Sequence, residues 1–175
     1  ESKNLKLLFV GQKSNNNNRK GFNYVLELCN ILDFPHEIII VGENDSEIKD
    51  LFINKNTNVS LKGSLNYEDL KKNYEFSDIL LLPSLQDNFP NTILESFSSG
   101  TPVIAFNTGG IKDLVNENTG YLAKFKSTND LKEGVHYVKN NLKELSEYIL
   151  VNNKKYDYSN IGKMFEQLYI KHLNN

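Results

Sequence analysis

The chain has 175 residues, which is long enough for one well-buried domain and short for two. Its 20 basic and 22 acidic side chains give a net charge of -2 and are scattered along the chain, so no footprint for nucleic acid is present. No apolar run approaches the roughly 20 residues of a membrane span, so we expect a soluble, cytoplasmic protein without a transmembrane segment, whose partners are small molecules.

Apolar runs of strand length alternate with segments of helical period along the whole chain. The predicted strands cover residues 5–10, 37–41, 59–61, 79–82, 103–106 and 121–123. Helices are predicted over residues 46–53, 67–76 and 92–99, and two further helices are predicted to start after residues 21 and 110. Two C-terminal helices complete the series, and the second of them covers residues 157–173. This alternation predicts an α/β fold, a Rossmann-like doubly wound parallel sheet with helices on both faces, as a single domain over residues 1–175.

Cys29 is the only cysteine, so an internal disulfide is excluded. It lies in the apolar stripe of the first predicted helix, between Val25 and Leu32. This position predicts a packed core thiol and not a nucleophile.

The loop from Gly11 to Gly21 is the first candidate site. It follows a predicted strand and delivers Arg19, the only arginine, and Lys20 to the start of a helix, a combination suited to binding phosphate. The alternative is that both are solvated charges on a polar loop. The dinucleotide glycine fingerprint and the lysine ending of a phosphate loop are both absent.

Asp87 and Glu95 form the second constellation, on either side of the loop and helix start that follow strand 79–82. Backbone amides at Asn91 and Thr92 are expected to be free there and to point into the crevice above the sheet. Glu95 also has a structural interpretation, a capping box in which it bonds the amide of Thr92, and Asp87 also fits an ordinary loop acid.

A carboxylate on each side of an anion-binding helix end suits a ligand with phosphates in the middle and polyols at both ends, such as a nucleotide sugar. Gly109 and Gly110 follow strand 103–106 and would let backbone approach such a ligand closely. The three histidines show no metal-ligand spacing, and no Asp-x-Asp pair is present, so we expect neither a metal site nor a cofactor.

With these residues in place, the chain resembles the C-terminal, donor-binding half of GT-B fold retaining glycosyltransferases of family 4. The resemblance covers nearly the whole chain, and its motifs are the first strand LLFVG, the RKG and VGE segments, the PS loop, TPVIAFNTGG and the ending YSNIGKMFEQLY. Together these motifs are specific, whereas none is specific alone.

The resemblance implies roles for the two acids, which are separated by seven residues as in the family. Glu95 would hold the ribose hydroxyls of the nucleotide. Asp87 and the loop of Asn88, Phe89 and Asn91 would hold the transferred sugar, with Thr92 at the helix start. The base would lie near Gly63, and the donor would be a UDP- or GDP-sugar.

The chain departs from the family pattern in both loops. The family diphosphate is held by an arginine just after Gly11 and by a lysine that Lys20 matches, but Gln12 stands where the arginine is expected. We expect Arg19 to supply that charge from the neighbouring position. Asp87 stands in place of the usual Glu, and Pro90 in place of a glycine, so the identity of the sugar does not carry over.

The function that follows is donor binding for retaining transfer of a sugar to an acceptor glycan or glycolipid, with Lys20 and Asp87 as the catalytic residues. Bacterial surface polysaccharide synthesis at the inner membrane face fits the family. The resemblance also implies an N-terminal acceptor domain ahead of this chain, so the isolated domain is expected to turn over poorly. The alternatives are a non-catalytic nucleotide-binding or interaction domain of the same fold, and a sugar-nucleotide epimerase of GT-B type.

Overall fold

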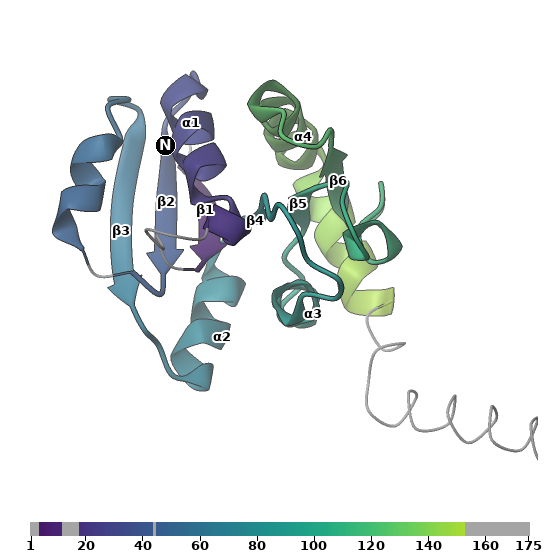
Figure 1. Ribbon diagram of the computed structural model, residues 1–175. Helices are drawn as coiled ribbons and strands as arrows, with labels where there is room; N and C mark the ends of the chain where they lie inside the picture. The colour runs from purple at the N-terminus through teal and green to yellow at the C-terminus, as the bar shows by residue number, and fades with distance from the viewer. Residues whose placement is uncertain (1–3, 12–17, 44, 153–175) are drawn as a thin grey trace, which may run out of the picture.

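A parallel sheet with helices on both faces makes up the described part of the chain, which in the computed structural model comprises residues 4–11, 18–43 and 45–152 (Figure 1). The strands are β1 (Leu5–Val10), β2 (His36–Val41), β3 (Thr57–Gly63), β4 (Ile79–Leu82), β5 (Val103–Phe106) and β6 (Gly120–Ala123). The α-helices are α1 (Phe22–Ile31), α2 (Tyr67–Phe76), α3 (Asn91–Ser98) and α4 (Thr128–Asn152). Three short 3₁₀ helices complete the series: η1 (Asn18–Lys20), η2 (Ser46–Leu51) and η3 (Ile111–Asp113).

The strand order is β3-β2-β1-β4-β5-β6, and the neighbouring strands pair in parallel. The chain builds one side of the sheet from β1 outward, then crosses to the other side of β1 to add β4. In open α/β sheets the point where the order reverses is where ligands bind, beyond the carboxyl ends of the strands. The loops that follow β1 and β4 therefore meet at this switch point.

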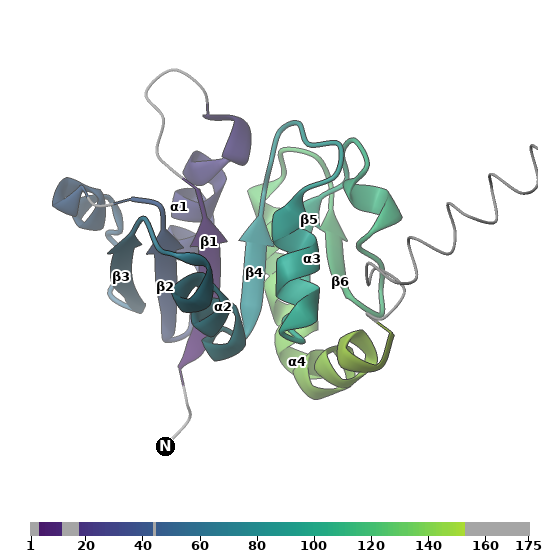
Figure 2. The ribbon, with the colours of Figure 1, turned by 90° about the horizontal axis from the view of Figure 1, so that it is seen from below.

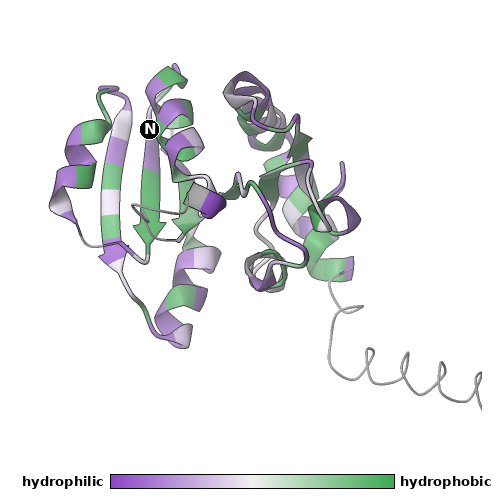
Figure 3. Ribbon diagram, viewed as in Figure 1, coloured by the Kyte–Doolittle hydropathy of each residue, from purple (hydrophilic) through white to green (hydrophobic). Residues whose placement is uncertain are grey.

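Two apolar layers enclose the sheet, because its central strands bury both faces. One layer joins the sheet to α1 and most of α4, and the other joins it to α2 and α3, as Figures 1 and 2 show. Near its end, α4 contributes Ile149 to the second layer, so this helix connects both layers. In Figure 3 the end of β2 is apolar throughout, whereas the edge strand β3 mixes polar and apolar residues.

The core position predicted for Cys29 is confirmed. The side chain is fully buried in the layer that contains α1, and the thiol is free. Burial raises the pKa of the Cys29 thiol far above its ordinary value, which leaves it protonated and unreactive.

The parallel α/β prediction is confirmed, with differences in detail: β2 and β6 each begin one residue earlier than predicted, and the helix after Gly110 is the 3₁₀ helix η3. Strand β3 is longer than residues 59–61 because it pairs with β2 along the length of that strand, with a register shift next to Gly63. The segment predicted as a helix over 46–53 is the 3₁₀ helix η2, which Asp45 begins by accepting a hydrogen bond from the amide of Glu47. Helix α3 begins at Asn91 and not at Thr92. The helix predicted over 157–173 lies outside the described residues.

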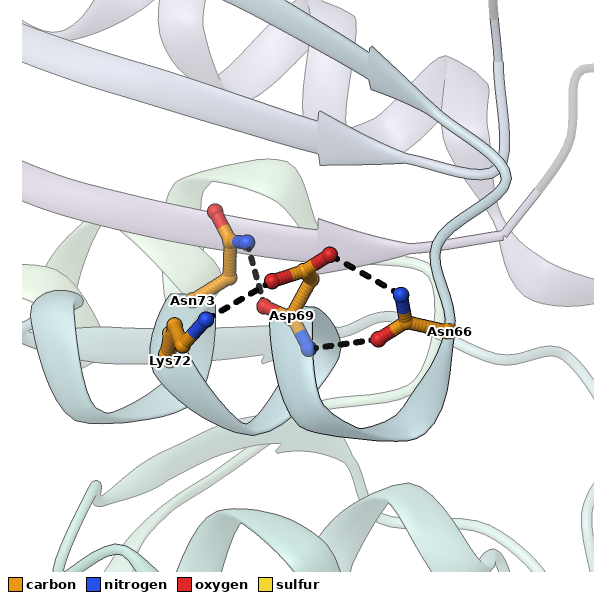
Figure 4. Close-up of polar contacts among 4 residues, drawn as sticks. All are labelled: Asn66, Asp69, Lys72 and Asn73. Atoms are coloured by element: carbon orange, nitrogen blue, oxygen red, sulfur yellow. Dashed lines mark hydrogen bonds and ion pairs between the residues drawn. The ribbon is translucent and has the colours of Figure 1, made fainter.

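A small polar cluster fixes the start of α2 (Figure 4). Asn66 is the N-cap: its side-chain oxygen accepts a hydrogen bond of 2.9 Å from the amide of Asp69, and its Nδ2 donates to Asp69 Oδ2 at 3.0 Å. Lys72 Nζ donates to Asp69 Oδ1 at 2.9 Å. These bonds satisfy the helix end and fix where α2 begins after β3, and so where its last turn meets α3.

Candidate functional site

The loops that follow β1 and β4 are held together by their backbones. The amide of Leu85 donates to the carbonyl of Arg19 at 2.8 Å. Gly21, the N-cap of α1, has φ +76°, and a Cβ at this position would lie 1.9 Å from the carbonyl oxygen of Pro83. Only glycine permits both this conformation and this contact. The 3₁₀ turn that carries Arg19 and Lys20 therefore rests directly on the loop after β4.

Lys20 and Asp87 are brought into contact by this arrangement. Lys20 Nζ donates to Asp87 Oδ2 at 3.1 Å, and their side chains are 30% and 16% exposed. The cation comes from the turn before α1, and the carboxylate comes from the loop after β4. The sequence predicts a separate role for each residue, and the structure adds that the two form an ion pair with each other.

The loop after β5 supports Asp87 from the other side. A Cβ on Gly109, at φ +52°, would lie 2.2 Å from the carbonyl oxygen of Asp87, and one on Gly110 would lie 1.9 Å from that of Asn88. The amide of Gly110 donates to the Asp87 carbonyl at 3.3 Å. The two glycines were expected to let backbone approach a ligand. The structure shows that they let backbone approach the loop at Asp87 and Asn88, which they hold in place, and the approach to a ligand stays a prediction.

The start of α3 offers hydrogen-bond donors at the same end of the sheet (Figure 2). Ile93 N bonds the carbonyl of Pro90 at 3.0 Å, whereas within the described residues the amides of Asn91 and Thr92 donate to no partner. Ser84 Oγ and Thr92 Oγ1 are buried and lack hydrogen-bond partners in this part of the chain. Free amides at a helix N-terminus favour an anion.

Glu95 does not form the capping box that its spacing from Thr92 suggested. Because Pro90 is the N-cap and no side chain caps the helix, Glu95 lies more than one turn inside α3. Its Oε2 accepts a hydrogen bond of 2.8 Å from the hydroxyl of Tyr74, in the last turn of α2. Burial, and then the neighbouring Glu95 carboxylate, raise the pKa of Tyr74 well above its ordinary value, so the phenol stays a donor.

The other residues predicted for the site follow the ends of the strands. Gly11 follows β1, and its amide donates to the carbonyl of Val41 at 2.9 Å. Gly63 ends β3 with φ +61°, two strands away from the switch point. Phe89 is exposed, as is Arg19, which forms no ion pair within the described part of the chain. Gln12 lies outside the described residues.

The carboxyl end of the sheet thus gathers a cation, an acid and free helix amides, next to loops that the backbone holds together, whereas Glu95 lies inside α3 and faces α2. Residues 1–156 match the model of the family described as "Glycosyl transferases group 1". The chain belongs to this family.

Other group 1 glycosyltransferase domains have similar sequences. A glycosyltransferase of Methanocaldococcus jannaschii is 29% identical over 93% of this chain and 44% of its own length. An amylovoran biosynthesis glycosyltransferase of Erwinia amylovora is 29% identical over 60% of this chain and 29% of its own length. The chain therefore spans less than half the length of these relatives.

Solved structures show that this domain has the GT-B type of fold. The galactosyltransferase WaaB of the lipopolysaccharide outer core superposes with a TM-score of 0.82 at 19% identity, over 98% of this chain and 50% of WaaB. The Anabaena protein HepE, in complex with UDP-glucose, superposes with a TM-score of 0.77 at 17% identity, over 96% of this chain and 49% of HepE.

Two features of this glycosyltransferase domain were not expected from its sequence. The hydroxyl of Tyr74 contacts Glu95, although Tyr74 reads as an ordinary apolar position of α2. Gly21 permits a close contact with Pro83, more than sixty residues away. Only the spacing of glycines next to the strand ends could have drawn attention to the second feature.

The described residues contain neither a metal-ligand cluster nor a membrane-spanning helix. Within 4–11, 18–43 and 45–152, no group of three or more His, Cys, Asp or Glu side chains is placed to hold a metal ion. No helix in the same ranges has the length and apolar character needed to cross a bilayer.

Proposed function

We propose that this domain binds a nucleoside diphosphate sugar, UDP- or GDP-linked, for retaining transfer of the sugar to an acceptor glycan or glycolipid. The observation that carries the proposal is the meeting of Lys20, Asp87 and the start of α3 at the switch point of the sheet. A cation and free amides suit the diphosphate, and the carboxylates suit the hydroxyls at either end of the ligand. The UDP-glucose bound to the structural neighbour HepE supports this ligand class.

The diphosphate is assigned to Lys20 and to the amides of Asn91 and Thr92. To reach a phosphate, Lys20 exchanges its bond to Asp87 for one to the ligand. The exposed Arg19 lies on the same 3₁₀ turn and supplies a second positive charge, in place of the arginine that the family has at the position of Gln12. No metal ion takes part in this scheme, because side chains and helix amides stabilise the charge of the diphosphate.

The two ends of the donor are assigned to the two acids. Asp87, released by Lys20, accepts hydrogen bonds from hydroxyls of the transferred sugar, and the loop of Asn88 and Phe89 also contacts this sugar. Glu95 accepts the ribose hydroxyls, and the base lies toward Gly63 at the end of β3. An E. coli relative that is a UDP-Gal-dependent galactosyltransferase is 37% identical over half of this chain and supports a hexose donor.

Transfer begins when the bond between the sugar and the diphosphate weakens and negative charge grows on the leaving phosphate. Lys20, Arg19 and the helix amides stabilise that charge more strongly in the transition state than in the bound donor, which is the condition for catalysis. The acceptor attacks the face from which the diphosphate leaves, so the configuration is retained. The acceptor is held by a further domain. Sugar transfer takes place on the cytoplasmic side, at the inner membrane face when the acceptor is a lipid.

Calorimetric titration with UDP and GDP tests the proposal. We expect the chain to bind one of them, and we expect Lys20→Ala to weaken that binding about ten- to a hundredfold, as for the loss of a charged hydrogen bond. Lys143→Ala is the matched control, because Lys143 is an exposed lysine at the opposite end of the sheet, paired with Glu147. Binding of neither nucleotide would refute the proposal and favour a non-catalytic interaction domain.

A further inference from the structure

Tyr74 combines a deeply buried ring with a hydroxyl that reaches a candidate ligand-binding residue. Its side chain is 2% exposed, and its hydroxyl donates to Glu95 Oε2 at 2.8 Å. A buried phenol needs a hydrogen-bond partner, but a backbone carbonyl would serve that need equally well. The Tyr74 hydroxyl instead donates to a half-buried carboxylate on α3, so this bond joins α2 to α3 through one oxygen, Glu95 Oε2.

The backbone around Tyr74 is fixed at both ends of α2. The Tyr74 carbonyl accepts hydrogen bonds from Thr101 Oγ1 at 2.8 Å and from the amide of Ser77 at 3.1 Å. At the other end of the helix, the cluster around Asn66 and Asp69 holds the first turn (Figure 4). The hydroxyl of Tyr74 is therefore a fixed point against which a mobile side chain can be oriented.

Glu95 is such a side chain. A glutamate has three rotatable bonds, so ordering it for a ligand costs entropy unless another group restrains it beforehand. Within the described residues its side chain makes no bond other than the one from Tyr74, which engages Oε2 and leaves Oε1 available. Lys71 lines the same hollow and pairs with Glu75 instead, at 3.8 Å.

We propose that Tyr74 is a positioning residue: its hydroxyl holds Oε2 of Glu95 so that Oε1 is ready to accept the 2′-hydroxyl of the nucleotide ribose. This inference rests on the proposed function, because it assigns Tyr74 to the ribose end of the donor. It predicts that a hydroxyl which never touches the nucleotide decides how strongly the protein distinguishes a ribonucleotide from its 2′-deoxy counterpart.

The test compares UDP and GDP with 2′-deoxy-UDP and 2′-deoxy-GDP by calorimetry, in the wild-type chain and in Tyr74→Phe. We expect wild type to prefer the ribonucleotide about tenfold to a hundredfold, the contribution of one charged hydrogen bond. Tyr74→Phe should lose most of this preference, by weakening the ribonucleotide while leaving the deoxynucleotide nearly unchanged. Tyr67→Phe is the matched control on the same helix, since Tyr67 is 69% exposed and does not bond Glu95.

The outcomes separate the inference from the proposed function. If Tyr74→Phe weakens both nucleotides by the same factor, or neither, Tyr74 is only structural and the inference fails. If wild type binds UDP or GDP without preferring the ribose form, Glu95 does not accept the 2′-hydroxyl, and the inference fails while donor binding stands. If wild type binds neither nucleotide, both fail together.

Discussion

At the amino end of the sheet, a hollow of about 630 Å³ opens between α4 and the segments that lead into β4 and β5. At the carboxyl end, by contrast, the loops after β1, β4 and β5 are in close backbone contact with one another. Three of the polar groups that line the hollow already have hydrogen-bond partners. Ser77 Oγ donates to the Asn73 carbonyl at 2.6 Å, Asp78 accepts from the amide of Lys6 at 2.8 Å, and Thr101 Oγ1 donates to the backbone of α2.

The carboxyl end keeps unused groups despite its closer packing. In the described part of the chain, the amides at the start of α3 and the hydroxyls of Ser84 and Thr92 lack partners there. Buried polar groups in proteins are nearly always paired, so such exceptions need a reason. Unpartnered hydrogen-bonding groups therefore distinguish the carboxyl end of this sheet, where the proposed site lies, from the hollow at the amino end.

The largest expected difference between the two ends concerns their left-handed glycines. Gly21→Ala forces a methyl group against the Pro83 carbonyl, whereas Gly100→Ala, at nearly the same φ of +74°, meets only the flexible side chain of Leu150 at 2.8 Å. We expect losses of unfolding free energy of about 3 and about 1 kcal/mol, respectively. Urea denaturation of both variants measures this, and equal losses would contradict the idea that the carboxyl loops are the more tightly held.

The next effect is the coupling between Lys20 and Asp87. A double-mutant cycle with Lys20→Ala and Asp87→Ala should give a coupling of about 1 kcal/mol, since the pair is partly shielded from solvent. The Lys143 and Glu147 pair beside the hollow is 3.9 Å apart and exposed, so its cycle should give less than about 0.5 kcal/mol. Similar couplings in the two cycles would show that the ion pair at the carboxyl end is an ordinary surface contact.

The smallest effect is a pH dependence at the amino end, where His36 begins β2. Burial lowers the pKa of His36 below its ordinary value of 6.5, and its hydrogen bond to the Phe34 carbonyl opposes this in part. The folded state thus favours the neutral ring, so this stability is present above the unfolded pKa and is lost as the pH falls through the lower folded pKa.

Unfolding of wild type and His36→Gln at about pH 7.5 and about pH 5.5 checks this prediction. Wild type should lose more stability than the variant on acidification. An equal loss in both proteins would mean that other groups cause the acid sensitivity.

The sequence predicted the fold well where local signals agree with tertiary packing. Strands β4 and β5 and helix α2 have the predicted bounds, because short apolar runs are bounded by proline and glycine and a helical stripe begins after Asn66. Segment 46–53 has a similar pattern but forms a 3₁₀ helix, which sequence period alone does not distinguish from a short α-helix.

The site could be predicted only as a set of residues. Lys20, Asp87 and Glu95 were identified by type and by their places next to strand ends. Their partners could not be predicted, because the contact of Lys20 with Asp87 and that of Glu95 with Tyr74 join elements far apart in the chain. The capping box failed for a related reason: the N-cap of α3 is Pro90 and not Thr92, so Glu95 lies too far into the helix to reach back to its start, and it accepts from Tyr74 of α2.

The bond between Lys20 and Asp87 has a consequence for competing anions. An anion that approaches Lys20 also approaches the negative charge of Asp87, whose Oδ2 lies 3.1 Å from Lys20 Nζ and opposes its binding. Under the proposed function, sugar hydroxyls donate hydrogen bonds to Asp87, so a nucleotide sugar offsets part of this repulsion and inorganic phosphate does not. The same carboxylate would then favour the sugar-bearing ligand over a small phosphate at this cation.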